Sequence, residues 1–265
     1  MIPKRCLSAV PQIFWLAVVA VASAQGQGIR ISPAEASSIG KRIWKNECGG
    51  TISGLTSWNK GETFASLGIG HFIWFPKGVK ASYEESFPPL IAFMKAKGVA
   101  LPGWLRKTPD CPWQTRGEFE KASGTARMKE LRAFLKDTIP QQVDFILQRL
   151  DQALPKMLRA VAKRDRETVR RRFYAVASTG TGKYALMDYV NFKGEGTSPK
   201  ERYKGQGWGM LQVLQGMRGM PAGMAAASEF GTAGIRVLTR RVKNAPKDES
   251  KWLEGWTNRC NSYRR

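Results

Sequence analysis

Apolar and polar positions follow a helical period in the first ordered stretch of the chain. Ile39, Ile43 and Trp44 recur at spacings of three and four residues, which places them on one face of a helix. Ser32-Pro33-Ala34-Glu35 supplies an N-cap, a proline in the first turn and a glutamate three residues after the cap, and Gly49-Gly50 can end the helix. The pattern predicts a helix over Pro33–Cys48.

The helical period is lost between residues 52 and 75. Threonine, tryptophan, phenylalanine and isoleucine are frequent there, and Asn59-Lys60-Gly61 is a turn signal. Gly68 and Gly70, inside a strand pattern, indicate close approach of another backbone or a ligand. We predict a β-hairpin with a third short strand over residues 67–73, forming one wall of a cleft.

From residue 86 onward the apolar period is again helical. Helices are predicted over residues 88–97, 125–136, 140–153, 154–162, 167–178, 184–192, 207–217, 222–242 and 250–259, and residues 98–113 form an irregular proline-rich segment. The fold class is therefore α+β, mostly helical with a small antiparallel sheet. We expect one domain over residues 25–265, with a β lobe at about 50–76 and a helical lobe at about 86–260.

The N-terminal residues have the features of a secretory signal peptide. Lys4 and Arg5 precede an apolar stretch at residues 13–22, and Ala22-Ser23-Ala24 has the small residues of a cleavage site. The apolar stretch is too short to span a bilayer. We expect residues 1–24 to be removed and the protein to be periplasmic or secreted, without a stable membrane anchor; an uncleaved anchor is the alternative.

The chain is strongly basic, with a formal net charge of +22, and loss of Lys4 and Arg5 lowers that charge by two. Such a field attracts polyanions and repels polycations. Export favours anionic cell-envelope polymers over nucleic acid as partners. The densest basic run, at residues 163–172, is either a solvated helix face or a polymer-binding strip.

Cysteine and histidine usage limits the chemistry that the chain can support. After processing, Cys48, Cys111 and Cys260 remain, and an oxidising compartment permits one disulfide, for which we favour Cys111 with Cys260. No two cysteines have CxxC spacing, and the chain has one histidine. We expect no metal and no cofactor.

Glu47 is the main candidate for catalysis. It lies three, four and eight residues after Trp44, Ile43 and Ile39, so it shares their face of the helix, one residue before the helix ends. Burial and the negative end of the helix dipole both favour the protonated carboxyl, as a general acid requires. A glutamate that extends into solvent is the alternative.

Glu47, the hairpin and Ser66-Leu67-Gly68-Ile69-Gly70-His71 together resemble the active-site signature of phage-type lysozymes of the lysozyme superfamily. In that family a helix ends in the catalytic glutamate, and the hairpin carries an aspartate and then Thr-x-Gly-x-Gly-His. Residues 185–194 resemble the family's buried helix ending in Phe-Asn-x-Gly, and residues 236–241 are similar to its late arginine-rich helix. The resemblance implies a lysozyme-like fold; it covers about thirty residues near the start and about ten near residue 190.

Several roles follow from this resemblance. Glu47 matches the catalytic glutamate, Ser66 the threonine that orients the attacking water, and His71 the hairpin histidine, which is usually structural in the family. We expect substrate contacts from Asn59, Gly70, His71 and Asn191.

The sequence departs from the family at the second carboxylate. Lys60 stands where the family has its catalytic aspartate, and the nearest substitutes are Asn59 and Glu62. If Glu62 faces the cleft, an inverting hydrolase with Glu62 as base is implied. If Glu62 is an exposed turn residue, the one-glutamate mechanism of lytic transglycosylases remains, in which a hydroxyl of the substrate attacks.

The leading functional hypothesis is a monomeric enzyme that cleaves the glycan strands of peptidoglycan, either a muramidase or a lytic transglycosylase. A chitosanase fits less well because a basic protein repels a polycation. Two alternatives stay open: a lysozyme-like domain that binds cell-wall glycan without cleaving it, and a basic protein that acts on membranes or lipopolysaccharide without catalysis.

Overall fold

The computed structural model describes residues 28–79 and 84–265, so the predicted signal peptide lies outside the described residues. The described chain is mostly helical with a small antiparallel sheet, which confirms the α+β class. The helices are α1 (Pro33–Cys48), α2 (Phe87–Ala96), α3 (Arg116–Lys121), α4 (Ala126–Asp137), α5 (Ile139–Ala160), α6 (Arg166–Ala177), α7 (Gly180–Lys193), α8 (Met210–Gly216), α9 (Gly223–Asn244) and α10 (Ser250–Asn261). The strands are β1 (Thr56–Ser57), β2 (Ala65–Leu67), β3 (Phe72–Trp74), β4 (Arg202–Tyr203) and β5 (Gln206–Gly207).

Helix α1 has the predicted bounds, and its ends show why. The Ser32 side chain accepts a hydrogen bond from the Glu35 amide, and the Glu35 carboxylate accepts one from the Ser32 amide, which completes the capping box. At the other end Gly49 adopts a left-handed conformation, with φ of 61°, and its amide donates to the Trp44 carbonyl. Glu47 is therefore held one residue before a defined helix end.

The three-stranded sheet has the order β1-β2-β3, and both pairings are antiparallel. Ser57 lies opposite Ser66, and Ser66 lies opposite Ile73. The third strand begins at Phe72 and not at residue 67 as predicted, because residues 68–71 form a turn. In this turn Gly68 and His71 have positive φ angles of 70° and 46°.

Side chains, and not the backbone or ligand that was predicted, approach the two glycines of this turn. A Cβ on Gly68 would meet the Oε1 atom of Gln142 on α5 at 2.3 Å, and one on Gly70 would meet Phe72 at 2.7 Å and Asn191 at 3.0 Å. The buried Gln142 side chain also accepts a hydrogen bond from the Ile69 amide at 2.8 Å. The turn is therefore fixed to α5 on one side and lies beside α7 on the other.

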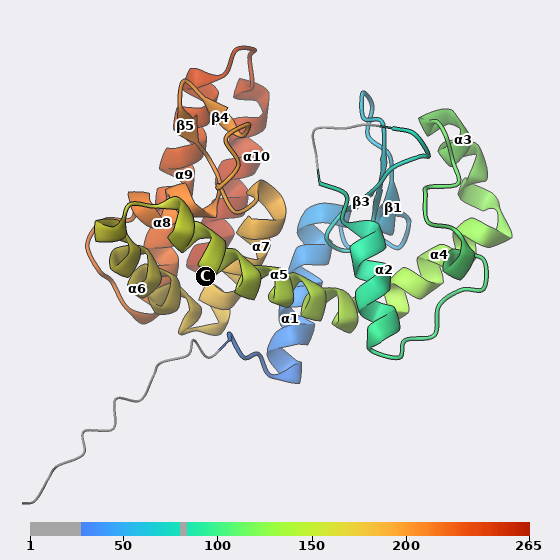
Figure 1. Ribbon diagram of the computed structural model, residues 1–265, viewed down its shortest axis with the longest axis horizontal. Coiled ribbons are helices and arrows are strands. Elements are labelled where there is room, and N and C mark those ends of the chain that lie inside the picture. Colours follow the sequence, from blue (N-terminus) through green and yellow to red (C-terminus); the bar gives the residue numbers. More distant parts are fainter. Residues whose placement is uncertain (1–27, 80–83) are drawn as a thin grey trace, which may run out of the picture.

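The long helix α5 connects two groups of elements (Figure 1). Strands β1–β3 and helices α2–α4 lie on one side, and α6–α10 with β4 and β5 lie on the other. Helix α2 packs against β3, and α4 contacts the 3₁₀ turn Ser53–Leu55. The elements beside the sheet therefore extend well beyond residue 76, to the end of α4.

Two helical predictions need correction. Residues 140–153 and 154–162 were predicted as separate helices, but α5 is continuous over Ile139–Ala160 with Pro155 inside it. Helix α3 was not predicted, because its six residues carry a single buried apolar side chain, Phe119, and show no apolar period.

The predicted Cys111–Cys260 disulfide is wrong, since both thiols are free, as is that of Cys48. Cys111 lies beside the sheet, where its amide donates to the Phe75 carbonyl, whereas Cys260 lies in α10 among the later helices. Burial, the largest cause, raises the pKa of each thiol to about 12.

The helices of the described residues were also compared with the length and apolar character that a membrane span requires. None of them meets both requirements.

Candidate functional site

The carboxylate of Glu47 lies in a polar cluster formed by the end of α1, the turn before β3, α7 and α10. Arg259 of α10 donates to Glu47 Oε1 at 2.5 Å, although 212 residues separate the two in sequence. The Glu47 side chain is 14% exposed and that of Arg259 is 10% exposed. Glu47 is thus partly buried, and a cation lies against its carboxylate.

Asn191 joins α7 to this cluster. Its Nδ2 atom donates to the Gly70 carbonyl at 3.1 Å and lies 3.4 Å from Glu47 Oε1. One amide therefore contacts both the catalytic candidate and the glycine turn. Because Gly70 has no Cβ, the Asn191 side chain can approach the backbone this closely.

His71 contacts the second oxygen of Glu47. Its Nδ1 atom lies 3.5 Å from Glu47 Oε2, and its Nε2 atom lies 3.4 Å from the Ser57 hydroxyl. Ser66 is 4% exposed and pairs directly with Ser57 across the sheet, so both side chains are on one face. The hydroxyl in contact with His71 is that of Ser57, with Ser66 as its neighbour.

Asp188 of α7 is joined to the cluster through Arg259. It is fully buried, and Arg259 donates to its two oxygens at 2.7 and 2.8 Å. Asp188 also accepts hydrogen bonds from the Tyr263 hydroxyl and the Asn46 amide. Burial opposes the charge on Arg259, but the carboxylates of Asp188 and Glu47 outweigh it and hold the pKa of Arg259 well above its ordinary value.

Asn59 and Glu62 bond to their own turn. Asn59 Nδ2 donates to Glu62 Oε2 at 3.1 Å in the turn between β1 and β2, and Trp58 Nε1 donates to the Glu62 carbonyl at 2.8 Å. Within the described residues neither Asn59 nor Glu62 forms a hydrogen bond or an ion pair with Glu47. The structure thus assembles Glu47, Gly70, His71 and Asn191, with Ser66 beside them in the sheet, and leaves the two turn residues outside.

A cluster of cations and aromatic rings continues from Arg259. The Arg259 guanidinium lies 4.1 Å from the centre of the Phe192 ring, and the Lys193 ammonium lies 4.1 Å from Phe192 and 3.7 Å from Trp256. Burial, then the nearby charges of Arg241 and Arg259, lowers the pKa of Lys193 to about 7. Within the described residues this ammonium has no hydrogen bond to an acceptor.

Three residues of the site were not predicted from the sequence: Arg259, Asp188 and Ser57. Asp188 carried a usable signal, because it is the only acidic residue in the otherwise mainly apolar run 184–192, and a buried acid requires a cation or donors. Nothing local distinguishes Arg259 from the many other basic residues. Its role depends on a contact across 212 residues of sequence.

The arrangement holds the Glu47 carboxylate mainly through one of its two oxygens. Arg259 and Asn191 both approach Oε1 and fix the carboxylate, whereas Oε2 has only the longer contact with His71. Two carboxylates share one guanidinium, and the side chain of Glu47, at 14% exposed, is more accessible than that of Asp188, at 0%. Among the described residues no group of three or more His, Cys, Asp or Glu side chains could hold a metal ion.

In comparisons with known proteins, no family model, curated protein or solved structure matches this chain.

Proposed function

We propose that this protein cleaves the glycan strands of peptidoglycan on a lysozyme-like scaffold, with Glu47 as the general acid. The observation that carries the proposal is the contact set of Glu47. A carboxylate at the end of α1 lies beside the Gly-Ile-Gly-His turn, with Asn191 and Arg259 at one oxygen and His71 near the other. Apart from Arg259, these are the elements, in the same order, that the resemblance to phage-type lysozymes implies.

The charge of the protein supports the substrate class. Peptidoglycan and its attached polymers are anionic, and the chain without Lys4 and Arg5, with a formal net charge of 22 − 2 = +20, raises their concentration near its surface. The export expected from residues 1–24 agrees with a substrate outside the cytoplasm.

A mechanism with one glutamate fits the site better than one with two. Lys60 occupies the position of the family's aspartate, and the carboxylate of Glu62 is hydrogen-bonded to Asn59 within its turn. Asp188, the other acid of the cluster, is fully buried and already bound by Arg259 and Tyr263. Glu47 would then protonate the leaving oxygen and afterwards accept the proton of the substrate hydroxyl that attacks the anomeric carbon. This outcome is lytic transglycosylation.

The test is digestion of purified peptidoglycan, followed by mass spectrometry of the products. We expect anhydro-ended fragments from the wild-type protein and none from Glu47→Gln. Glu254→Gln, which removes an exposed acid of α10, is the matched control and should retain activity. Fragments heavier by one water, lost in Glu62→Gln, would instead indicate hydrolysis with Glu62 as base.

Glycan binding without cleavage is the second candidate, and the 2.5 Å contact of Glu47 with Arg259 favours it, because that contact already occupies one oxygen of the carboxylate. Co-sedimentation of the wild-type protein with insoluble peptidoglycan, without release of fragments, would support this function and overturn the catalytic one. Lysis of whole cells that is unchanged in Glu47→Gln would instead support action on membranes or lipopolysaccharide.

A further inference from the structure

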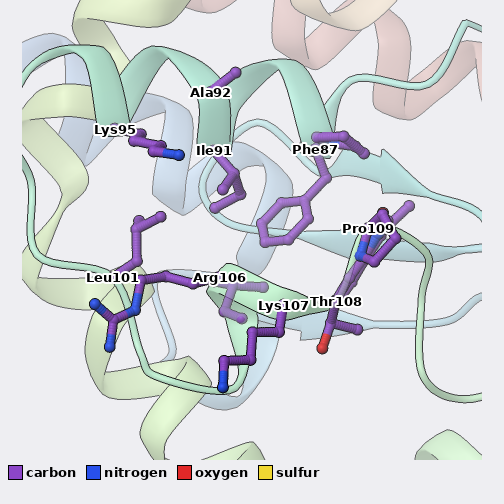
Figure 2. Close-up of a pocket in the computed structure, with 12 residues that line it drawn as sticks. Phe87, Ile91, Ala92, Lys95, Leu101, Arg106, Lys107, Thr108 and Pro109 are labelled. Atoms are coloured by element: carbon purple, nitrogen blue, oxygen red, sulfur yellow. The ribbon is translucent and has the colours of Figure 1, made fainter.

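A cavity of about 360 Å³ lies beside the sheet, between α2 and residues 101–109 (Figure 2). This volume is near the lower end of the range of about 300–1,000 Å³ that ligand pockets span. None of the residues of the Glu47 cluster lines it. It is a separate feature of the molecule and has no part in the proposed cleavage.

The interior of the cavity is apolar. Trp74 and Phe87 are each 1% exposed and Leu105 is 3% exposed, and Ile91 and Leu101 contribute further aliphatic surface. Figure 2 shows the side chains of Phe87 and Ile91 extending from α2 toward the opposite segment. Apolar surface of this kind is favourably covered by hydrocarbon.

The walls of the cavity are fixed by hydrogen bonds, so it is formed before any ligand arrives. Trp74 Nε1 donates to the Pro109 carbonyl at 3.0 Å, which ties β3 to the far segment. Within that segment the Thr108 hydroxyl donates to the Trp104 carbonyl at 2.8 Å. The 3₁₀ turn Leu105–Lys107 is therefore held in place. A ligand can bind without a conformational change that would lower its affinity.

The rim of the cavity is basic. Lys95 comes from α2, and Arg106 and Lys107 come from the opposite segment, so cations approach the opening from both sides. All three residues are exposed, and within the described part of the chain none of their charged groups has an ion pair or hydrogen bond. No acidic residue lines the cavity.

We propose that this cavity binds a single-chain anionic amphiphile, with the hydrocarbon chain against Trp74, Phe87 and Leu105 and the anionic head group at Lys95, Arg106 and Lys107. The apolar interior selects the chain, and the basic rim selects the sign of the head group. The small volume favours one chain over the two chains of a bilayer lipid. A free fatty acid is the simplest ligand of this class.

Titration calorimetry with dodecanoate below its micelle concentration tests the proposal. We expect one saturable site per chain, and no saturable binding of butyrate or dodecyltrimethylammonium. The triple variant Lys95→Gln, Arg106→Gln, Lys107→Gln should bind dodecanoate at least about tenfold more weakly, since each exposed ion pair contributes up to about fivefold. Leu101→Trp, which fills the cavity, should abolish binding.

A matched triple variant separates the rim from the general basic field. Lys200→Gln, Lys204→Gln and Lys247→Gln remove the same charge from exposed positions elsewhere and should change dodecanoate affinity less than about twofold. The rim substitutions lie on the surface, so they test the site even if Leu101→Trp perturbs folding. Equal losses in the two triple variants, wild-type affinity in a folded Leu101→Trp, or a response only to anionic phosphatidylglycerol vesicles would each overturn the proposal.

Discussion

Arg259 is the residue on which the candidate site depends most directly. Its guanidinium contacts Glu47 at 2.5 Å and Asp188 at 2.7 and 2.8 Å, and Asp188 has no exposed surface. A buried carboxylate without a cation is far less stable than the same carboxylate in a pair. Arg259 therefore orients the catalytic candidate and neutralises the buried acid beneath it.

Replacing Arg259 should consequently affect stability as well as activity. Arg259→Ala should lower the free energy of unfolding by about 3–5 kcal/mol, because Asp188 is left charged and unpaired. Addition of Asp188→Asn should recover part of this loss, since the second change removes the uncompensated charge. Urea titrations of the single and double variants measure the coupling, and Arg264→Ala, at an exposed position of the same C-terminal segment, is the control. Strictly additive losses would contradict the shared-cation arrangement.

Lys193 predicts a pH-dependent stability. Its pKa falls from an ordinary 10.5 to about 7 because of burial and the charges of Arg241 and Arg259. Between about pH 7 and pH 10.5 the unfolded chain therefore binds one proton that the folded chain does not, and this group makes the free energy of unfolding rise with pH. Below about pH 7 both states are protonated, and the full cost of the buried charge applies.

The variant Lys193→Met removes this cost while keeping an apolar stem. It should stabilise the protein by about 1–3 kcal/mol at pH 6 and by less at pH 9. The expected gain at pH 6 is smaller than the full cost of the buried charge, because the substitution also removes the attraction between the ammonium and the Trp256 ring. Thermal unfolding of both proteins at the two pH values measures the difference. Lys251→Met, at an exposed lysine near the Trp252 ring, should show no such pH dependence. A stability difference that is the same at both pH values would show that Lys193 keeps its charge in the folded state.

At the scale of single elements, the buried apolar face of α5 keeps this helix continuous in spite of an internal proline, Pro155. Proline inside a helix removes one hydrogen bond and clashes with the preceding turn, at a cost of about 3 kcal/mol. In α5 the buried residues Val143, Ile146, Leu150 and Leu154 continue past this point to Met157 at helical spacing. Burial of that continuous face holds the helix together through Pro155.

Pro155→Ala should therefore stabilise the protein. Pro155 is exposed, so no packing is lost, and alanine restores an amide donor to the Asp151 carbonyl. We expect a gain of about 1–3 kcal/mol after the greater freedom of the unfolded chain is allowed for. A rise in the thermal midpoint would show it. Pro140→Ala, in the first turn of α5 where a proline breaks no hydrogen bond, should give little change.

The elements that the sequence predicted well are those with strong local signals at both ends. Helix α1 has its capping box and its glycine terminator, and its bounds were predicted without error. The start of β3 was misplaced because the left-handed conformation of His71, a residue with a Cβ, has no sequence signature of its own. The position of Glu62 relative to Glu47 could not be predicted from the neighbouring sequence, because it depends on the conformation of the long turn between β1 and β2.

At the scale of the whole molecule, the candidate site combines four parts of the chain that are distant in sequence. The resemblance to phage-type lysozymes, which covers separate motifs of the chain, predicted Glu47, Gly70, His71 and Asn191. Arg259 completes the cluster from a helix near the C-terminus. No periodicity reports which of the 43 basic side chains reaches a given carboxylate. Only tertiary packing, with α10 against α9 and α7 against α9, brings this arginine to α1.

The net charge of the whole molecule gives the last prediction, which concerns association with the proposed substrate. After loss of Lys4 and Arg5, a formal charge of 22 − 2 = +20 acts on an anionic polymer through solvent, where the screening length falls from about 10 Å at 0.1 M salt to about 3 Å at 1 M. Binding of insoluble peptidoglycan by the Glu47→Gln variant should therefore weaken at least about tenfold between these two salt concentrations. Co-sedimentation measures this binding without the complication of turnover. The cavity beside α2 provides an internal contrast, because the apolar part of dodecanoate binding does not weaken with salt. Glycan binding that is unaffected by salt would assign recognition to direct contacts at the Glu47 cluster and remove the role of the basic field.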